Sequence, residues 1–580
     1  MKRWIGAILP AYIGTLGACE IARATEISPH SFLWVLLFLA LTLATRGFLR
    51  LSDRRLQRMS LFLGFGFSLS MALGYQMQFR QGIGGWPGLT LVLITALGFA
   101  PSAGQGVLRL YHACAGLRLL PAGNTSSPRK AFWRYFSLLM LCWFPVFLAY
   151  YPGLFAYDAH RQIAQVLEGT YQTQHPLLHT LFLGLFYRLG ELFHSPPFGM
   201  ALHTLCQLAL QALAMAYMLS YLRRSGCARA VRLAILGFFA LCPLYSMMGI
   251  SMTKDVLFSV SLVLSLMLMQ EACLSPEKLQ KKSFVLSLVF SVALACFLRT
   301  NGLMVYLLLV PALVLRKSRQ QAMRRIAALL LAGIIFFGGG SWILSRVLST
   351  SQPAALREVL SVPLQQVGRV YNLHKDELDC KEEIEEFIPG VYAYVPTFAD
   401  HIKAFANVGT GNVKEFMELW FQLMKEYPGD YLDAFLFNCQ GFWFMDDLSQ
   451  GNHYGEGTEG RQGYMLSDTK KGFGIEPHSY LPPLEALYEE LFSNNRYREI
   501  PVIAQLFSLA LYSWLLLFLL FVALYERQQN LLLCLGGLMV TLLWLALSPC
   551  AIVRYQYPLM LGVPLFFGLI FGTGKAAPKS

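Results

Sequence analysis

The sequence predicts a polytopic α-helical membrane protein. Hydrophobic residues make up 55% of the chain and charged residues only 14%, and the mean hydropathy is +0.47. Soluble domains carry roughly 25% charged residues, so this composition argues against a soluble protein. The apolar residues come in continuous blocks of roughly 15–24, the length that a helix needs to cross a hydrocarbon core of about 30 Å. Strands of a membrane barrel would instead alternate apolar and polar residues.

We expect about fourteen transmembrane helices, with both termini on the cytoplasmic side. Lysine and arginine gather in short loops between the apolar blocks, and such loops stay in the cytoplasm. These loops are 46–58, 109–134, 223–232, 278–282 and 316–325. The expected spans are 4–20, which we interpret as retained and not as a signal peptide, then 31–48, 60–77, 86–106, 131–151, 198–221, 231–249, 253–273, 283–298, 301–315, 325–348, 501–524, 530–547 and 556–572.

One further apolar segment, 176–193, does not fit this alternation. If it crossed the membrane, the basic loop 223–232 would lie outside. A histidine, a tyrosine, an arginine and a glutamate interrupt the segment, as expected of a helix that lies along the membrane surface with one wet side. We therefore expect 151–197 to be an outer loop with one or two interfacial helices.

The acidic residues are concentrated in one long segment, 349–500. It holds 24 of the 34 acidic residues but only 12 of the 47 lysines and arginines. Under the expected topology this segment lies outside the cytoplasm and forms a mixed, mainly α-helical domain, with an amphipathic helix at 413–427. Cys380 and Cys439 fall within it and are either two buried thiols or a disulfide.

These observations divide the chain into four parts. Residues 1–125 form accessory transmembrane helices, and 131–348 form a membrane core that includes the outer loop. Residues 349–500 form the extracytoplasmic domain, and 501–580 return to the membrane to complete the core. The basic residues outside the acidic domain lie in short loops, so their excess does not indicate nucleic-acid binding.

Unusual polar residues gather at the predicted outer ends of the helices, and the first of them is Asp158. It is one of only ten acidic residues outside the acidic domain, and His160 and Gln162 follow it closely. A carboxylate at the membrane surface can act as a general base or as a ligand of a metal or a donor phosphate. The alternative is a helix N-cap, because an Asp before an amphipathic run is a good cap.

The second and third groups are His175-Pro176 and Lys254-Asp255. His175 either shapes a site or simply begins a helix. Lys254 and Asp255 begin a span near membrane depth, where an unpaired charge costs about 2.5–3.5 kcal/mol. They could pair with one another, and Asp255 suits the positive end of a helix. Lys254 does not suit that end, which favours an anionic partner such as a phosphate.

The last two groups each contain an arginine at an outer helix end. Arg299 begins the motif Arg-Thr-Asn-Gly, in which Asn301 and the glycine would also suit a tight turn. A turn does not need a cation, however. Arg554 and Tyr555 open the last span. With Lys254 this makes three cations on one face, which indicates an anionic, phosphorylated ligand. A soluble nucleotide sugar is disfavoured, because the chain has no phosphate-binding glycine-rich loop.

The motifs resemble those of GT-C glycosyltransferases, and more closely a bacterial branch of GT-C-like membrane proteins. The resemblance covers about 131–572, and the first four spans look like an addition. The strings that carry it are Tyr151-Pro152-Gly153 with Asp158 and Gln162, His175-Pro176 with His179-Thr180, Thr253-Lys254-Asp255-Val256-Leu257, Arg299-Thr300-Asn301-Gly302, and Arg554-Tyr555 with Pro558.

The resemblance implies an inverting glycosyltransferase in the bacterial plasma membrane. It would move a sugar from a polyprenyl-phosphate donor to a cell-envelope glycan or lipid on the outer face. Asp158 would activate the acceptor hydroxyl, His175 would shape the site, and three cations would hold the lipid phosphate. The predicted substrate-binding residues are His160, Gln162, His175, Lys254, Asp255, Arg299, Asn301, Arg554 and Tyr555.

Dependence on a divalent metal, Mg²⁺ or Mn²⁺, stays open at this point. Many relatives show a paired acidic motif in the first outer loop. Here Tyr157-Asp158 offers a single acid, so no residue is assigned as a metal ligand.

Two other functions compete with the transferase. One is a transporter or flippase for an anionic lipid or small anion. Against it, the sequence shows no inverted repeat, and the polar residues lie at one face and not at mid-membrane depth. The other is a non-catalytic partner in an envelope-assembly complex.

Overall fold

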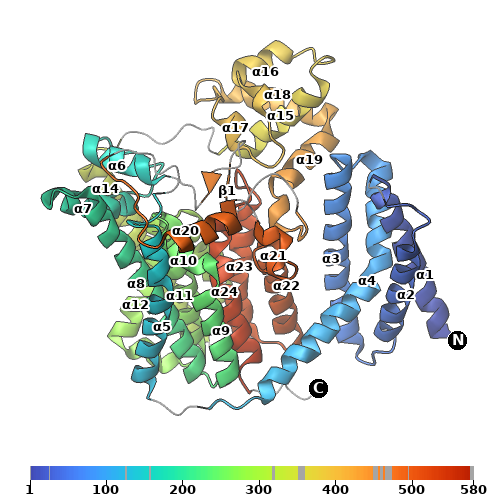
Figure 1. Ribbon diagram of the computed structural model, residues 1–580, viewed down its shortest axis with the longest axis horizontal. Helices are drawn as coiled ribbons and strands as arrows, with labels where there is room; N and C mark the ends of the chain where they lie inside the picture. The colour runs from blue at the N-terminus through green and yellow to red at the C-terminus, as the bar shows by residue number, and fades with distance from the viewer. Residues whose placement is uncertain are drawn as a thin grey trace.

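A computed structural model shows a long bundle of helices with a smaller helical domain at one end (Figure 1). The structure describes residues 2–24, 27–123, 127–155, 158–316, 320–350, 359–447, 455–456, 462–463, 473–493 and 496–574. The strands in these ranges are β1 (Gly455–Glu456) and β2 (Gln462–Gly463), which form one antiparallel pair.

Within the described residues, seven helices are long and apolar enough to cross a membrane. They are α1 (Lys2–Ile21), α3 (Arg54–Arg80), α4 (Gly85–Gly116), α5 (Pro128–Ala149), α8 (Pro196–Arg224), α11 (Lys254–Leu274) and α14 (Gln320–Val347). The chain is therefore an α-helical membrane protein, as its composition predicts.

Shorter helices occupy the other predicted spans. Apolar helices of 14 to 17 residues are α2 (Phe32–Phe48), α12 (Lys282–Leu298), α13 (Asn301–Val314), α22 (Leu509–Tyr525) and α23 (Gln529–Leu545), and the last helix is α24 (Val553–Phe571). A helix of 17 residues is about 26 Å long, slightly less than the hydrocarbon core. The count of fourteen spans therefore stays a prediction.

The segment predicted as one span at 231–249 is broken in the structure. It forms α9 (Arg229–Leu241) and α10 (Pro243–Ile250), which meet at an angle of 52°. The cause is Pro243, which has no amide hydrogen to donate and disfavours helical geometry in the residue before it. The carbonyl that it would have bound is that of Phe239, and Trp143 Nε1 donates to this oxygen instead at 3.1 Å.

The span predicted at 501–524 begins later than expected. Residues 503–506 form the short helix α21 (Ile503–Leu506), and α22 starts only at Leu509. Val502 has a φ of 68°, which ends regular structure there, and Ser508 is extended as the N-cap of α22.

The loop between α5 and α8 carries two helices, α6 (Ala159–Glu168) and α7 (Leu177–Leu192). The start of α5 and the end of α8 lie at the same end of the bundle, because Arg223 Nη1 donates to Ser127 O at 3.1 Å. Helices α6 and α7 lie at the other end, the same end as the small domain (Figure 1). This arrangement supports the prediction that 176–193 does not cross the membrane.

The small domain contains α15–α19 and its own hydrophobic core. Its helices are α15 (Ser361–His374), α16 (Lys381–Phe387), α17 (Asp400–Lys403), α18 (Val413–Glu426) and α19 (Pro428–Asn438). Helix α18 matches the amphipathic helix predicted at 413–427. Cys380 and Cys439 are both free thiols, which excludes the disulfide in this structure.

Hydrogen bonds to two parts of the bundle attach this domain. Asp433 accepts a hydrogen bond from Ile83 N at 3.0 Å, and Arg369, which pairs with Asp433 at 3.2 Å, donates to Gln81 O at 2.8 Å, so α15 and α19 are tied to the turn between α3 and α4. Ala399 N donates to Pro549 O at 2.8 Å, next to the start of α24. The domain therefore lies over both the accessory helices and the core.

Short elements complete the fold. Helix α20 (Pro482–Tyr488) packs against α5 and is followed by a π-helical turn at Glu489–Ser493. Among the described residues, 3₁₀ turns form at Ala22–Ala24, Leu117–Leu119, Pro276–Gln280, Val391–Ala393, Gln440–Phe442 and Arg496–Glu499.

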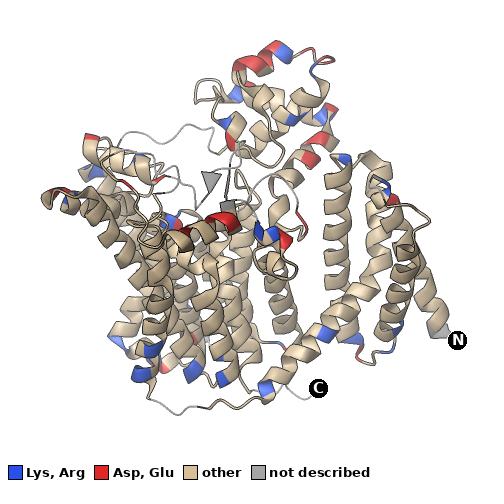
Figure 2. Cartoon of the chain, in the orientation of Figure 1, with Lys and Arg blue, Asp and Glu red and all other residues tan. Residues whose placement is uncertain are grey.

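Charge is distributed unevenly between the two ends of the molecule. Figure 2 shows lysine and arginine at the lower ends of the helices, whereas aspartate and glutamate gather on the small domain and α20. Helix α8 ends in Arg223 and Arg224 at the lower end. The long basic loops of the sequence thus lie opposite the acidic domain.

The bond from Trp143 to Phe239 can be tested by a double-mutant cycle with Pro243. Trp143→Phe removes the donor and should lower the free energy of unfolding. In a Pro243→Ala background the new amide can donate to Phe239 O. The loss of unfolding free energy caused by Trp143→Phe should therefore be about 1 kcal/mol smaller in that background. Thermal unfolding of the four purified proteins measures this coupling, and equal costs in both backgrounds would contradict it.

Candidate functional site

Three cations and two carboxylates meet where the bundle joins the small domain. We call Asp158, Lys254, Asp255, Arg299 and Arg554 the polar cluster. The N-terminal ends of α6, α11 and α24 and the turn between α12 and α13 supply these side chains. All five were predicted as site residues, and the structure brings all five together.

Asp158 stands at the N-cap position of α6, but its side chain makes no capping hydrogen bond. Its Oδ2 instead accepts from Lys254 Nζ at 2.8 Å and lies 3.6 Å from Arg554 Nη1. His175 Nδ1 lies 3.9 Å from the same oxygen. Asp158 therefore occupies the predicted N-cap position, but its carboxylate is directed into the polar cluster and does not cap the helix.

Asp255 is the second carboxylate and has no exposed surface. Arg299 Nε lies 3.0 Å from its Oδ1, while Thr253 Oγ1 donates to its Oδ2 at 3.0 Å. Arg554 Nη1 lies 3.9 Å from Oδ2. Asp255 thus pairs with the arginines and Lys254 with Asp158, whereas the sequence also allowed Lys254 and Asp255 to pair with one another.

Tyr555 supports the two arginines. Its ring lies beneath both guanidinium groups, with centroid distances of 4.5 Å for Arg299 and 4.8 Å for Arg554. Its hydroxyl also accepts from Arg554 Nη2 at 3.2 Å. Cation–π contacts of this kind favour planar guanidinium over ammonium. Tyr555 therefore orients the arginines, and its predicted contact with a substrate stays a prediction.

Gln162 connects α6 to α7 away from the cluster. Its Nε2 donates to Thr180 Oγ1 at 3.0 Å, and its Oε1 is 3.0 Å from His179 Nδ1. Because a carbonyl oxygen only accepts, His179 carries its proton on Nδ1. Gln162 is almost fully buried in these contacts, which hold α6 against α7, and its predicted contact with a substrate stays a prediction. His160 is half-buried in the first turn of α6.

The polar cluster sets the charge of Asp158 and His175. Burial raises the pKa of the Asp158 carboxyl, but Lys254, Arg554 and His175 lower it more strongly, and it ends well below its usual value. Burial lowers the pKa of His175 to about 4, although the charge of Asp158 opposes this shift. At neutral pH Asp158 is therefore a carboxylate and His175 is neutral.

A pocket of about 400 Å³ opens beside the polar cluster. We call it the cluster pocket. Its polar side carries Lys254, Arg299, His175 and Asn301. Its apolar side is formed by α7, the end of α12 and α14, through Leu177, Leu178, Phe297, Phe337 and Leu344. Such a pocket can take a ligand that has a charged head and an apolar chain.

The charges of the cluster do not balance. Three cations face two carboxylates, and His175 is neutral, which leaves one positive charge in excess. Lys254 and Arg299 also line the cluster pocket, so the excess charge is accessible from it. An anionic group in the pocket would be stabilised both by this charge and by the low exposure of the surrounding side chains.

A divalent metal does not fit this donor set. Among the described residues, no group of three or more His, Cys, Asp or Glu side chains is placed to hold one. Both carboxylates already bind cationic side chains, and three cations would repel a metal ion. We therefore assign no step to a metal.

Sequence reasoning missed the wall contributed by α14. Ser341, Leu344 and Ser345 line the cluster pocket, but in sequence they belong to an ordinary apolar span. Small and aliphatic residues at helical spacing carry no signal that separates a pocket wall from a lipid-facing surface. Gln174 and Thr300 also line the pocket, and both neighbour predicted residues.

The fold and site define an α-helical membrane protein with a charged cluster at the end that carries an acidic domain. Residues 168–578 match the family model described as "Family of unknown function (DUF6020)", and the chain belongs to this family. The matched range includes four residues of the polar cluster, and Asp158 lies just before it. Comparison with curated proteins and with solved structures gave no significant match.

The low pKa of His175 predicts an acid-sensitive contribution to stability. The unfolded imidazole binds its proton near pH 6.5 and the folded one only near pH 4, so stability is lost as the pH falls between these values. The loss should approach about 3 kcal/mol. His175→Gln should remove that part of the pH dependence, measured by thermal unfolding at pH 7.5 and 4.5. An unchanged pH dependence in the variant would refute the assignment.

Proposed function

We propose that this chain is an inverting glycosyltransferase of GT-C type that uses a polyprenyl-phosphate-linked sugar and a cell-envelope acceptor. The observation that carries the proposal is the excess positive charge of the polar cluster, placed at the mouth of a pocket with an apolar wall. A polyprenyl phosphate has the matching chemistry, an anionic head on an apolar chain. The resemblance of the motifs to GT-C enzymes points to the same class.

In the proposed reaction the cations bind the donor phosphate. Lys254 and Arg299 line the cluster pocket and are about 85% buried, so they would contact the phosphate with little competition from water. Arg554 lies behind them and bridges the two carboxylates. These charges stabilise the leaving phosphate as negative charge develops on it.

Asp158 would act as the general base. The acceptor hydroxyl oxygen attacks the anomeric carbon, its proton passes to the Asp158 carboxylate, and the bond from that carbon to the phosphate oxygen breaks. The polyprenyl phosphate leaves with the electron pair, and the anomeric configuration inverts. A donor phosphate that draws Lys254 toward itself would raise the pKa of Asp158 and make it a stronger base.

We also propose the orientation of the protein in a bacterial plasma membrane. The basic ends of the helices would face the cytoplasm, with fourteen spans and both termini inside, and the acidic domain would lie outside. The separation of charge in Figure 2 supports this orientation through the positive-inside rule. The polar cluster would then face the outer leaflet and a cell-envelope acceptor.

Transport through the core is the weaker alternative. Between Lys254 at one end of α11 and Gln270 near the other, the helix is almost entirely buried in packed side chains. These 16 residues span about 24 Å. A transporter would need a path lined by polar groups that a ligand can reach, whereas the hydroxyls at the middle of α11 are used within the helix: Ser261 donates to Leu257 O and Ser265 to Leu262 O.

Removing the charge of Asp158 should abolish transfer. In proteoliposomes with a radiolabelled polyprenyl-phosphate sugar, Asp158→Asn should lower the rate at least 100-fold, since a general base contributes roughly 10²–10⁴-fold. Lys254→Gln should mainly weaken donor binding. Arg188→Gln, on the exposed side of α7, is the matched control and should retain activity.

Two outcomes would overturn this function. Transfer that persists in Asp158→Asn would eliminate this residue as the base. Movement of the labelled lipid across the bilayer with no transfer to any acceptor would favour a flippase. The wild-type protein must in either case be folded, as judged by a single elution peak in size-exclusion chromatography.

The orientation predicts opposite labelling at the two ends of the molecule. A cysteine at Lys414, which is 84% exposed on α18, should react with an impermeant maleimide in intact cells. A cysteine at Arg324, exposed at the start of α14, should react only after permeabilisation. Reaction of both positions in intact cells would contradict the proposed topology.

A further inference from the structure

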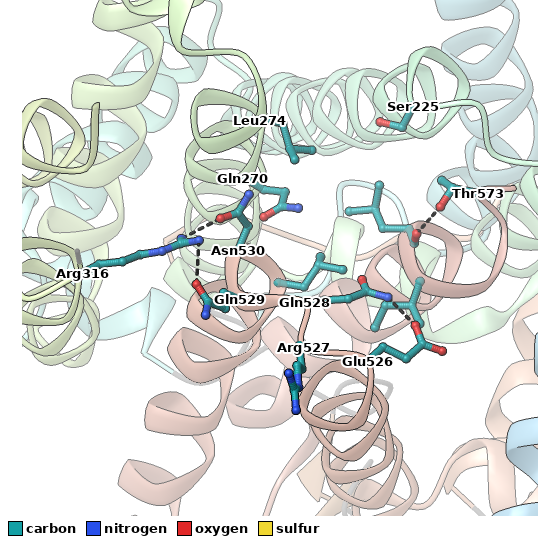
Figure 3. A pocket seen from close by; sticks show the side chains of 13 residues that line it. Ser225, Gln270, Leu274, Arg316, Glu526, Arg527, Gln528, Gln529, Asn530 and Thr573 are labelled. Atoms are coloured by element: carbon teal, nitrogen blue, oxygen red, sulfur yellow. Dashed lines mark hydrogen bonds between the residues drawn. The ribbon is translucent and has the colours of Figure 1, made fainter. Parts of the chain in front are cut away.

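A second polar pocket lies at the opposite end of the bundle. We call it the Gln270 pocket, and its volume is about 420 Å³. It forms where the ends of α8, α11, α22, α23 and α24 meet the residues that follow α13. Figure 3 shows that its lining is rich in carboxamide side chains, with Gln270, Gln528, Gln529 and Asn530 around it.

Arg316 supplies one positive charge at the edge of this pocket. Its guanidinium donates to Asn530 Oδ1 at 2.6 Å and to Gln529 Oε1 at 3.2 Å, as Figure 3 shows. Its Nε is buried and has no hydrogen-bond partner. Among the described residues no carboxylate lies within ion-pair distance of Arg316. Two neutral amides therefore orient a cation whose charge they do not compensate.

Arg527 adds a second cation. It lies in the turn between α22 and α23 with a φ of 57°, a left-handed conformation that is uncommon for a side-chain-bearing residue. Within the described part of the chain it forms no ion pair. Arg527 also lines the Gln270 pocket, on a different side from Arg316 (Figure 3), so two cations border the pocket.

The single carboxylate of the pocket is already neutralised. Glu526 pairs with Arg118 at 2.8 Å and accepts hydrogen bonds from Tyr111 and Gln528. The N-terminus of α23 also points its positive end at the pocket, and its N-cap Gln528 gives no side-chain cap. The pocket is therefore positive, and its amides offer further donors.

We propose that the Gln270 pocket binds a phosphate ester. Two arginines suit phosphate oxygens because the planar guanidinium donates two parallel hydrogen bonds. The carboxamides suit hydroxyl groups carried on the same ligand. The phosphate belongs either to a lipid headgroup of the adjacent leaflet or to a small soluble phosphate ester.

This site is separate from the polar cluster. The buried stretch of α11 between Lys254 and Gln270 keeps the two pockets about 24 Å apart. Binding here requires no sugar donor and no transfer reaction. The binding test of this pocket is therefore independent of whether the proposed transfer reaction occurs.

The test uses the purified full-length protein and two probes. Binding of glycerol 3-phosphate is measured by isothermal titration in detergent. Headgroup binding is measured by native mass spectrometry from nanodiscs of equal phosphatidylglycerol and phosphatidylcholine. Arg316→Gln and Arg527→Gln should each lower the affinity for the probe at least tenfold, because each substitution removes a charged hydrogen-bond donor. Arg325→Gln, exposed at the same end but outside the pocket, should leave binding unchanged.

Each outcome decides the proposal. If the wild-type protein binds glycerol 3-phosphate and both pocket variants lose this binding, the ligand is a soluble ester. If the wild-type protein selectively retains phosphatidylglycerol and both variants lose this retention, the ligand is a lipid headgroup. Binding of neither probe overturns the proposal, as does equal loss in Arg325→Gln. If Arg316→Gln does not fold, the exposed Arg527→Gln still provides the comparison.

Discussion

The ion pair between Lys254 and Asp158 is the contact on which this end of the bundle depends. It joins the start of α11, a helix buried along almost its whole length, to the loop that leads into α6. Arg554 contacts both Asp158 and Asp255, so α24 is held by the same group of charges. In buried pairs, loss of one partner costs about 3–5 kcal/mol because the other charge is left uncompensated. The loop, α11 and α24 are therefore constrained together, which gives the cluster a fixed geometry before any ligand arrives.

Packing of the core explains why the charged side chains lie at the two ends, whereas the interior holds neutral hydrogen-bonded groups such as Gln211 and Tyr557. Phe258, Leu262 and Leu266 on α11 are nearly unexposed, and each occupies a different turn. Charges placed among such side chains would meet a low dielectric and no compensating partners. At the ends, helix termini and loops supply partners of both signs. The two pockets thus follow from the same constraint, although their charge arrangements differ.

The amino-acid sequence was sufficient to predict the helical membrane fold and the convergence of the polar cluster, because long apolar blocks and isolated charges are strong signals. It could not predict the pairing within the cluster. Lys254 and Asp255 are adjacent in sequence, yet on a helix adjacent side chains point about 100° apart, and each finds a partner on another element. The break at Pro243 was predictable in principle, whereas the wall from α14 was not, since Ser341 and Leu344 resemble any lipid-facing residues. The start of α22 depends on the extended conformation of Ser508, which no pattern in this apolar segment indicates.

The charges of the cluster also bear on the proposed reaction. A sugar linked to a polyprenyl phosphate is a phosphodiester with one negative charge, which equals the positive excess of the cluster. When the sugar leaves, the polyprenyl phosphate becomes a monoester with up to two negative charges. In the same step Asp158 accepts the acceptor proton and loses its negative charge. The total charge of cluster and ligand is then zero before and after transfer, so a buried site avoids the cost of an uncompensated charge at either stage. A base placed outside the reach of Lys254 and Arg554 would not give this balance.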